Sequence, residues 1–362
     1  MKKLLKNVFS IKNEGVHKVV KICGLKLKLK SKYNRIIQSI NELKTENEKQ
    51  TDTLYKKIKS QQEFINKVNF LLTKGINKER IIYDIENFKD SGIKEQPRNP
   101  KLIVSLTSFP ERMYDLHFCL YSLLTQTLKP DEVILWLAAE EFPNKEADLP
   151  QKVLQLKDNG LTIKWCENIG SYKKLIPTIR EYPNDIIVSA DDDIFYPAEW
   201  LERLYNSYLK NPDYIHCHRA HKITFDASGC IEPYEKWKKC IDDKTCAFLN
   251  FATTGGGILY PPNCFYKDIL NEDIFMRLAP RADDIWFWAM CVLNNKKIKV
   301  IENPINQITY TNPARELQIF NEKTLYSTNG AAGGNDEQLK NVIEQYSQIL
   351  QTVVPDSMCQ QK

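Results

Sequence analysis

The chain has 362 residues, of which 42% are hydrophobic and 27% are charged, a composition typical of a soluble globular protein with room for one large domain and an appendage. It shows neither an apolar run near the roughly 18 residues of a membrane-spanning helix nor the pattern of a secretion signal. The formal net charge is +5, and ten cysteines are scattered without paired spacing, which favours reduced thiols in a cytoplasmic protein over a disulfide framework.

Residues 1–35 form a basic segment. They carry ten lysines and one arginine against one glutamate, a local charge of +10 that leaves −5 for the rest of the chain. The alternation from Leu25 to Lys30 predicts a strand, and turns at Glu14-Gly15 and Cys23-Gly24 complete a small amphipathic hairpin.

Two interpretations of this hairpin remain open. It could be a solvated flap packed on the body, or it could attach the protein to an anionic membrane, where each basic residue contributes about 1 kcal/mol. The apolar face favours the membrane and predicts a protein peripheral to the inner face of the cell membrane. Nucleic acid is not expected as a partner, because aromatic residues that stack on bases are missing here.

Residues 36–99 are predicted to be a helical spacer followed by a linker. From Tyr33 to about Lys74 the chain is rich in Glu, Lys, Gln and Asn and contains no Gly or Pro. Apolar residues occupy two heptad positions, but polar residues interrupt the seam, so residues 36–72 indicate at best a weak coiled coil and a homodimer. The members of the two positions are Ile36, Leu43, Phe64 and Leu71 for one, and Ile40, Leu54 and Val68 for the other.

Residues 100–355 are predicted to be an α/β domain. Four apolar runs alternate with helix-length segments, which indicates βαβ units and a mainly parallel sheet flanked by helices. The runs are 102–106, 132–137, 161–165 and 185–190. Ligands of such sheets bind beyond the carboxyl ends of the strands, where this sequence has "TSFPER", "CENIGSYKK" and "DDD".

The segment after the first run contains hydrogen-bonding and cationic side chains. Thr107 and Ser108 can hydrogen-bond a nucleotide, and Arg112 can bind phosphate. A Gly-rich phosphate cradle is absent. A capped turn before a helix at Tyr114 explains the same residues equally well.

Three consecutive carboxylates, Asp191, Asp192 and Asp193, follow the fourth run. One aspartate is enough to cap a helix, whereas three neighbouring carboxylates repel one another unless a cation compensates them. Mg²⁺ and Mn²⁺ are typically held by one or two carboxylates together with substrate phosphates. The sequence therefore predicts a divalent metal here, with a helix cap as the alternative.

A strand followed by Asp191-x-Asp193 resembles the GT-A-type nucleotide-sugar glycosyltransferases, in particular the inverting enzymes that build bacterial lipopolysaccharide and capsule. The resemblance covers Lys101 to about Ile343. It implies a Rossmann-like fold, with Asp191 near the donor ribose and Asp193 on the metal that bridges the diphosphate. Asp192 is then an indirect ligand.

The same resemblance assigns further donor-binding residues. It implies that "LTSFPERM" forms the site for the base and ribose, and that a loop with two adjacent lysines lies over the nucleotide. Sequence alone does not decide which lysine points inward. The residues concerned are Thr107, Ser108, Arg112, Lys173 and Lys174.

Two motifs in the second half complete the expected site. The resemblance places Gly255, Gly256 and Gly257 beside the donor sugar and acceptor, although glycine runs also serve as plain bends. It makes Asp284 the general base, while Asp283 departs from the usual Glu and leaves the assignment between them slightly open. An N-cap pair is the structural alternative, and Trp286 suits either a sugar-stacking wall or the core.

The run from Ile215 to Lys222 contains three histidines and one cysteine. In a strand His216 and His218 share one face while Cys217 points away, which disfavours a zinc site. We expect this run to be a strand that borders the crevice.

Together these features predict a metal-dependent, inverting transferase. It would move one sugar from a nucleotide-diphosphate donor, with a UDP-sugar as the first expectation, to a glycan or lipid-linked acceptor. A nucleotide-sugar hydrolase or a nucleotidyltransferase is the rival enzyme. A non-catalytic glycan-binding or scaffold protein of the same fold is the rival from another class.

Overall fold

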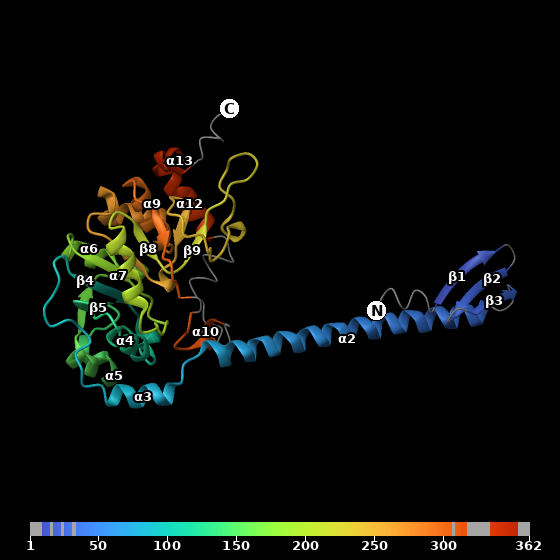
Figure 1. Ribbon diagram of the computed structural model, residues 1–362. Coiled ribbons are helices and arrows are strands. Elements are labelled where there is room, and N and C mark those ends of the chain that lie inside the picture. The colour runs from blue at the N-terminus through green and yellow to red at the C-terminus, as the bar shows by residue number, and fades with distance from the viewer. Residues whose placement is uncertain are drawn as a thin grey trace. The chain divides into compact units, whose positions relative to one another are not determined.

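The computed structural model describes residues 9–14, 17–22, 25–30, 34–305, 308–316 and 334–353. The chain divides into two compact units, Met1–Asn69 and Phe70–Lys362 (Figure 1). Within the basic segment, residues 1–8, 15–16, 23–24 and 31–33 lie outside the described residues, and these include Gly15, Cys23 and Gly24 of the predicted turns.

The first unit contains a three-stranded antiparallel sheet in place of the predicted hairpin. Its strands, in the order β1-β2-β3, are β1 (Phe9–Glu14), β2 (His17–Ile22) and β3 (Leu25–Lys30). The alternating run Leu25–Lys30 is thus a strand, as predicted.

The register of this sheet pairs apolar residues with one another on part of one face. Val20 pairs with Leu27 and Ile22 pairs with Leu25, and directly opposite residues share a face. On the other face Lys21 pairs with Lys26. Leu25 and Leu27 are exposed while Val20 is buried, so part of the apolar face is open to solvent.

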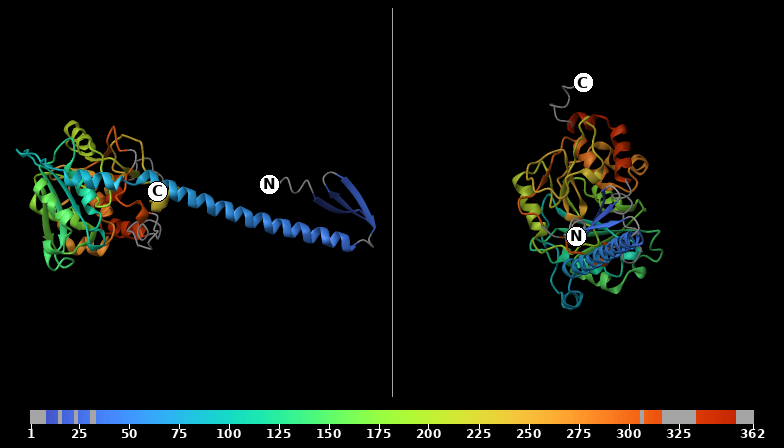
Figure 2. Two further views of the ribbon diagram at one scale, coloured as in Figure 1. Left: turned by 90° about the horizontal axis from the view of Figure 1, so that it is seen from below. Right: turned by 90° about the vertical axis from the view of Figure 1, so that its right-hand side faces the viewer.

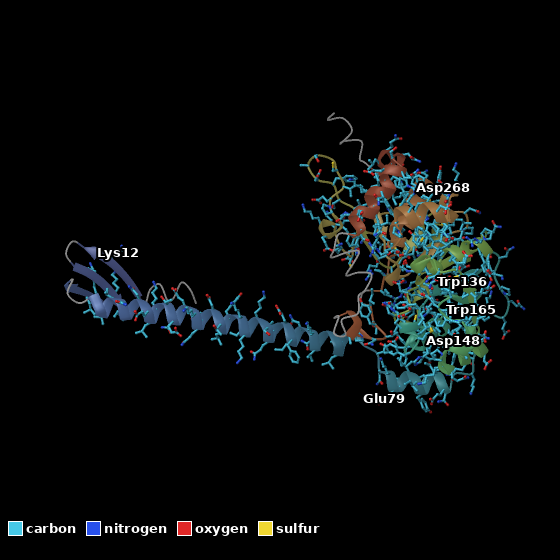
Figure 3. All side chains as sticks on the ribbon, turned by 180° about the vertical axis from the view of Figure 1, so that it is seen from behind. Lys12, Glu79, Trp136, Asp148, Trp165 and Asp268 are labelled. Atoms are coloured by element: carbon cyan, nitrogen blue, oxygen red, sulfur yellow. The ribbon has the colours of Figure 1, made fainter. Side chains whose placement is uncertain are left out.

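The helix α2 (Asn34–Lys74) is uninterrupted over 41 residues (Figure 2), as the absence of Gly and Pro predicts. From residue 41 to residue 69 every side chain is exposed except the half-buried Thr51 and Val68, and Figure 3 shows side chains that project from the helix both above and below it. No described helix combines the length and the apolar character needed to cross a membrane.

The second unit is built on a seven-stranded, mainly parallel sheet, as predicted. The strand order is β12-β8-β11-β7-β4-β5-β6, and only β11 runs antiparallel to its neighbours. The strands are β4 (Leu102–Thr107), β5 (Glu132–Ala138), β6 (Leu161–Cys166), β7 (Ile186–Ser189), β8 (Ile215–Cys217), β11 (Ile258–Tyr260) and β12 (Ile298–Val300). A small second sheet pairs β9 (Ala220–Lys222) with β10 (Asn250–Ala252).

Helices cover both faces of the large sheet. Side chains that alternate along β7 enter two different cores, so that Val188 packs in one and Ile187 in the other. The first core includes residues of α3 (Lys78–Glu86), α4 (Leu116–Leu124), α5 (Gln151–Leu154) and α7 (Trp200–Lys210). The second includes residues of α6 (Ile176–Glu181), α8 (Glu272–Leu278), α9 (Asp283–Leu293), α12 (Gly334–Gln345) and α13 (Gln348–Val353). The short α10 (Pro313–Glu316) follows β12.

This mixed α/β, Rossmann-like architecture fixes the position of the site. Neighbouring strands β4 and β7 are parallel, so their carboxyl ends meet at one edge of the sheet. The segments that begin at Ser108 and Asp191 therefore lie side by side.

Candidate functional site

At the carboxyl ends of β4 and β7, protein cations and hydroxyls bind the aspartate triplet. The Oγ of Ser108 donates to Oδ2 of Asp192 at 2.6 Å. One guanidinium nitrogen of Arg112, Nη1, lies 2.7 Å from Oδ1 of Asp192 and 2.6 Å from Oδ2 of Asp193. Arg112 thus compensates two of the three negative charges for which the sequence predicts a metal.

Lys174 compensates the third and links the triplet to the second acidic pair. Its Nζ lies 2.8 Å from Oδ1 of Asp191 and 3.3 Å from Oδ2 of Asp283. Burial lowers the pKa of this ammonium, but the charges of Asp191, Asp283 and Asp284 outweigh burial and leave the pKa above its ordinary value. Two motifs separated by about ninety residues of sequence therefore share one buried cation.

The second acidic pair lies at the first turn of α9. Asp284 accepts a hydrogen bond from Oγ1 of Thr254 at 2.6 Å. Neither aspartate is the N-cap, because that position is Ala282 and has no side-chain cap. The N-cap alternative therefore does not describe Asp283 and Asp284, although carboxylates in a first helical turn are favoured by the helix dipole.

The surroundings of Asp284 raise its pKa to about 7. Burial is the largest cause and the negative charge of Asp283 the next, while Lys174 and the hydrogen bond from Thr254 act in the opposite direction. A carboxyl group with a pKa near neutrality can exchange protons at physiological pH, as a general base requires.

The glycine run approaches the triplet from the other side. A Cβ on Gly255 would lie 3.6 Å from Oδ2 of Asp191, and one on Gly257, where φ is +91°, would lie 2.4 Å from the Trp200 indole nitrogen. That indole donates to the carbonyl of Gly256 at 2.8 Å. Gly257 therefore serves packing against Trp200, whereas Gly255 faces the site.

Arg219 is a half-buried site residue that sequence reasoning missed. Its Nε donates to Oγ1 of Thr253 at 2.6 Å, and its Nη2 lies 3.0 Å from the position of a Cβ on Gly255. Among the described residues no carboxylate forms an ion pair with it. The sequence feature that could have identified it is an arginine within the histidine-rich run, at the end of a strand that borders the crevice.

Those histidines are structural. His216 contacts Oγ of Ser207 through Nδ1 and the Asn211 carbonyl through Nε2, each at 2.9 Å. His218 contacts the Trp200 carbonyl in the same way. Burial lowers the pKa of both imidazoles to about 4, so they are neutral, and their nitrogens already have partners.

Three predicted residues have their side chains engaged elsewhere. The Thr107 hydroxyl donates to the Trp136 carbonyl at 2.9 Å. Lys173 pairs with Glu141 at 2.8 Å, so Lys174 is the lysine that reaches the triplet. Trp286 is fully buried and donates to the Ile269 carbonyl at 3.2 Å, which makes it a core residue and not a wall of an open site.

A hollow of about 340 Å³ lies beyond the carboxyl ends of β5 and β6. It is lined by Ala139, Glu140, Trp165, Cys166 and Glu167, and Trp165 is labelled in Figure 3. Its place at the same edge of the sheet as Asp191–Asp193 is where open α/β sheets bind ligands.

Within the described residues, no group of three or more His, Cys, Asp or Glu side chains is arranged to hold a metal ion by itself. Asp191 and Asp193 each give one oxygen to an internal cation, which leaves a second carboxylate oxygen on each. Two carboxylates plus substrate phosphates are a usual donor set for Mg²⁺. The residues thus fit a metal that arrives with a diphosphate, although charge compensation alone no longer requires one.

Comparisons with known proteins add little to this geometry. No family model matches the chain, and no curated protein matches it. Among solved structures that match is a CMP:2-keto-3-deoxy-manno-octonic acid synthetase complexed with CTP, with 10% identity over 60% of this chain and 95% of that one, at a TM-score of 0.33. This similarity is too low to carry an inference about activity.

Proposed function

We propose that the protein is a glycosyltransferase of GT-A type that moves one sugar from a nucleotide-diphosphate donor to a hydroxyl of a glycan or lipid-linked acceptor. The observation that carries the proposal is the position of Lys174, which ion-pairs with Asp191 and Asp283. Lys174 thus joins the proposed metal- and diphosphate-binding carboxylates to the acidic pair that contains the proposed base.

Asp284 is proposed as the general base. With a pKa of about 7, its carboxylate takes the proton from the acceptor hydroxyl as that oxygen attacks the anomeric carbon. The bond from the anomeric carbon to the diphosphate oxygen breaks, and the nucleoside diphosphate leaves with the electron pair. In-line attack inverts the anomeric configuration.

The donor is proposed to bind between the triplet and Arg219. Arg219 has guanidinium N–H groups beyond the one that Thr253 accepts, and such groups bind phosphate oxygens well. Mn²⁺ or Mg²⁺ held by Asp191 and Asp193 would neutralise charge on the departing diphosphate. The hollow lined by Glu140 and Trp165 is the proposed site of the nucleotide base, with a UDP-sugar as the first donor to test.

The sheet of the first unit is proposed to attach the protein to an anionic membrane surface. Leu25 and Leu27 would enter the interface, because both are exposed on one face. Lys21 and Lys26 lie on the opposite face, and the thickness of a sheet is about 10 Å. Since screening acts over about 8 Å at physiological ionic strength, each lysine contributes less than the roughly 1 kcal/mol of a surface contact.

Removal of residues 1–35 tests this attachment. The truncated protein should keep its activity on a soluble acceptor fragment and lose binding to vesicles that contain anionic lipid. High salt should weaken the binding of the intact protein only partly, because the apolar contact is not screened. Equal vesicle binding by both proteins in a flotation assay would exclude the membrane role.

The enzymatic proposal is tested by incubating the full-length protein with a panel of nucleotide sugars, with and without Mn²⁺ and a mixture of glycan and lipid-linked acceptors. A glycosyltransferase releases nucleoside diphosphate in step with a glycosylated product. Asp273→Asn is a matched control for Asp284→Asn, because Asp273 is an exposed acid in the first turn of α8.

Each rival function gives a different outcome. Release of nucleoside diphosphate at the same rate without acceptor indicates a hydrolase. Formation of pyrophosphate from a nucleoside triphosphate and a sugar indicates a nucleotidyltransferase. Nucleotide binding without turnover on any acceptor indicates a non-catalytic glycan-binding or scaffold protein.

A further inference from the structure

One face of α2 exposes a row of large apolar side chains. Leu43, Leu54, Ile58 and Ile65 are 64%, 54%, 52% and 50% exposed. At about 100° per residue they lie within about 60° of one another around the helix. We call these four residues the α2 stripe. Nothing in the described part of the chain covers it.

Apart from Ile58, whose counterpart is Gln50, the stripe is symmetric about Leu54. Leu43 and Ile65 each stand 11 residues from Leu54, on either side of it. In the sequence Ile40 and Val68 are also equidistant from Leu54, as are Ile36 and Leu72. After Leu54 the stripe no longer follows the heptad repeat, because it continues with Ile65 and not with Phe64. A spacing of 11 residues keeps a row of side chains nearly straight along a helix.

A pattern of apolar residues that is the same in both chain directions allows two antiparallel helices to place apolar residues opposite apolar residues. With Leu54 of each helix on the two-fold axis, Leu43 faces Ile65 of the partner subunit. A parallel pair would need no such symmetry, because each residue would face its own copy.

The charges on α2 are divided about the same residue. Residues 41–53 contain four acidic residues and two lysines, a net charge of −2, and residues 55–67 contain four lysines and one glutamate, a net charge of +3. An antiparallel pair places −2 against +3 at both ends. A parallel pair places like charge against like charge, which is unfavourable.

We propose that α2 is a self-association surface that binds α2 of a second copy of this chain, antiparallel and centred on Leu54. Self-association buries the α2 stripe on both helices. The palindromic apolar pattern and the divided charge support it independently of the enzymatic proposal.

The first test is the mass of the full-length protein in solution, measured by sedimentation equilibrium over a range of concentrations. Leu54→Lys places two ammonium groups on the two-fold axis and should raise the dimer dissociation constant at least tenfold. Tyr55→Lys is the matched control, because Tyr55 is exposed but lies about 100° from Leu54 around the helix. Lys forms helices nearly as well as Leu, so circular dichroism should show unchanged helix content in both variants.

The second test determines orientation by lysine cross-linking and mass spectrometry. In the antiparallel pair Lys44 lies within about one helical turn of Lys67 of the partner subunit, whereas about 35 Å separates residues 44 and 67 along one helix. A short cross-linker should join Lys44 to Lys67 in the intact protein and fail to do so in Leu54→Lys. A protein that stays monomeric at all concentrations, or cross-links of Lys44 to Lys44 without Lys44 to Lys67, would overturn the proposal.

Discussion

The two acidic clusters of the site are chemically similar in sequence and differently surrounded in the structure. Around Asp191–Asp193, Arg112, Lys174 and Ser108 supply positive charge and a donated hydrogen bond. Around Asp284 burial has the largest effect on the pKa, and the negative charge of Asp283 adds to it.

This difference separates two tasks. A cluster rich in cations keeps its carboxylates in place and suits the binding of a metal with a diphosphate. The carboxyl group of Asp284, with its pKa raised to about 7, can accept and release a proton near neutral pH. Lys174 contacts both clusters. Substitutions at and around Lys174 therefore test whether one cluster binds the metal and diphosphate while the other transfers the proton.

The largest effect is expected at the metal-binding side. Asp193→Ala removes one of the two carboxylates that have an oxygen free for a cation, and it should abolish the Mn²⁺-dependent part of nucleotide binding while the thermal unfolding transition stays cooperative. Calorimetric titration with and without Mn²⁺ measures this. Asp273→Ala should leave the Mn²⁺-dependent nucleotide affinity unchanged. An Asp193→Ala protein with unaltered Mn²⁺-dependent affinity would show that Asp193 does not bind the metal.

Loss of the shared cation comes next. Lys174→Met leaves Asp191 and Asp283 facing each other without compensation, and removal of one partner of a buried ion pair typically costs about 3–5 kcal/mol. Lys173→Met is the comparison, because Lys173 pairs with the single carboxylate of Glu141 whereas Lys174 pairs with two carboxylates, so a smaller loss is expected. Urea unfolding compares the two. Equal losses would mean that Lys174 does not join the clusters.

The smallest effect concerns the pH dependence of stability. The pKa of Asp284 in the folded protein, about 7, is above the value of about 3.9 for an unfolded aspartate. Its contribution is therefore fully present below about pH 4 and is lost as pH rises to about 7, at about 1.4 kcal/mol per pH unit. Asp284→Asn removes this loss, so its stability relative to the native protein should increase from pH 5 to pH 8. A difference that is constant with pH would contradict the raised pKa.

Much of the first half of the second unit was predictable from the sequence. Strands β4 to β7 are mainly apolar runs between turn residues, and such runs are recognised from hydrophobicity. Because they are parallel, the motifs that follow them were placed correctly at one edge of the sheet. The run from Ile215 to Lys222, predicted to be one strand, forms β8 and β9 in two different sheets. The strands β11 and β12 contain three residues each, too few for a period to be recognised.

Within the site, residue types were predictable and side-chain directions were not. Lys173 and Lys174 are adjacent in sequence, yet one pairs with Glu141 and the other with Asp191. The prediction of a metal assumed that no protein cation compensates the triplet, and Arg112 does so across 80 residues of sequence. Trp286 belongs to the core because α9 turns that face inward.

The pH–rate profile of Asp284→Asn beside that of the native protein tests the central claim most directly. For the native enzyme turnover should rise about tenfold per pH unit below pH 7 and level off above it, since the base must be ionised. The variant should keep its donor affinity, lose about 10²–10⁴-fold in turnover and show no inflection near pH 7. The product of the native enzyme should have inverted anomeric configuration. A variant that retains both the native turnover and the inflection would show that Asp284 is not the base.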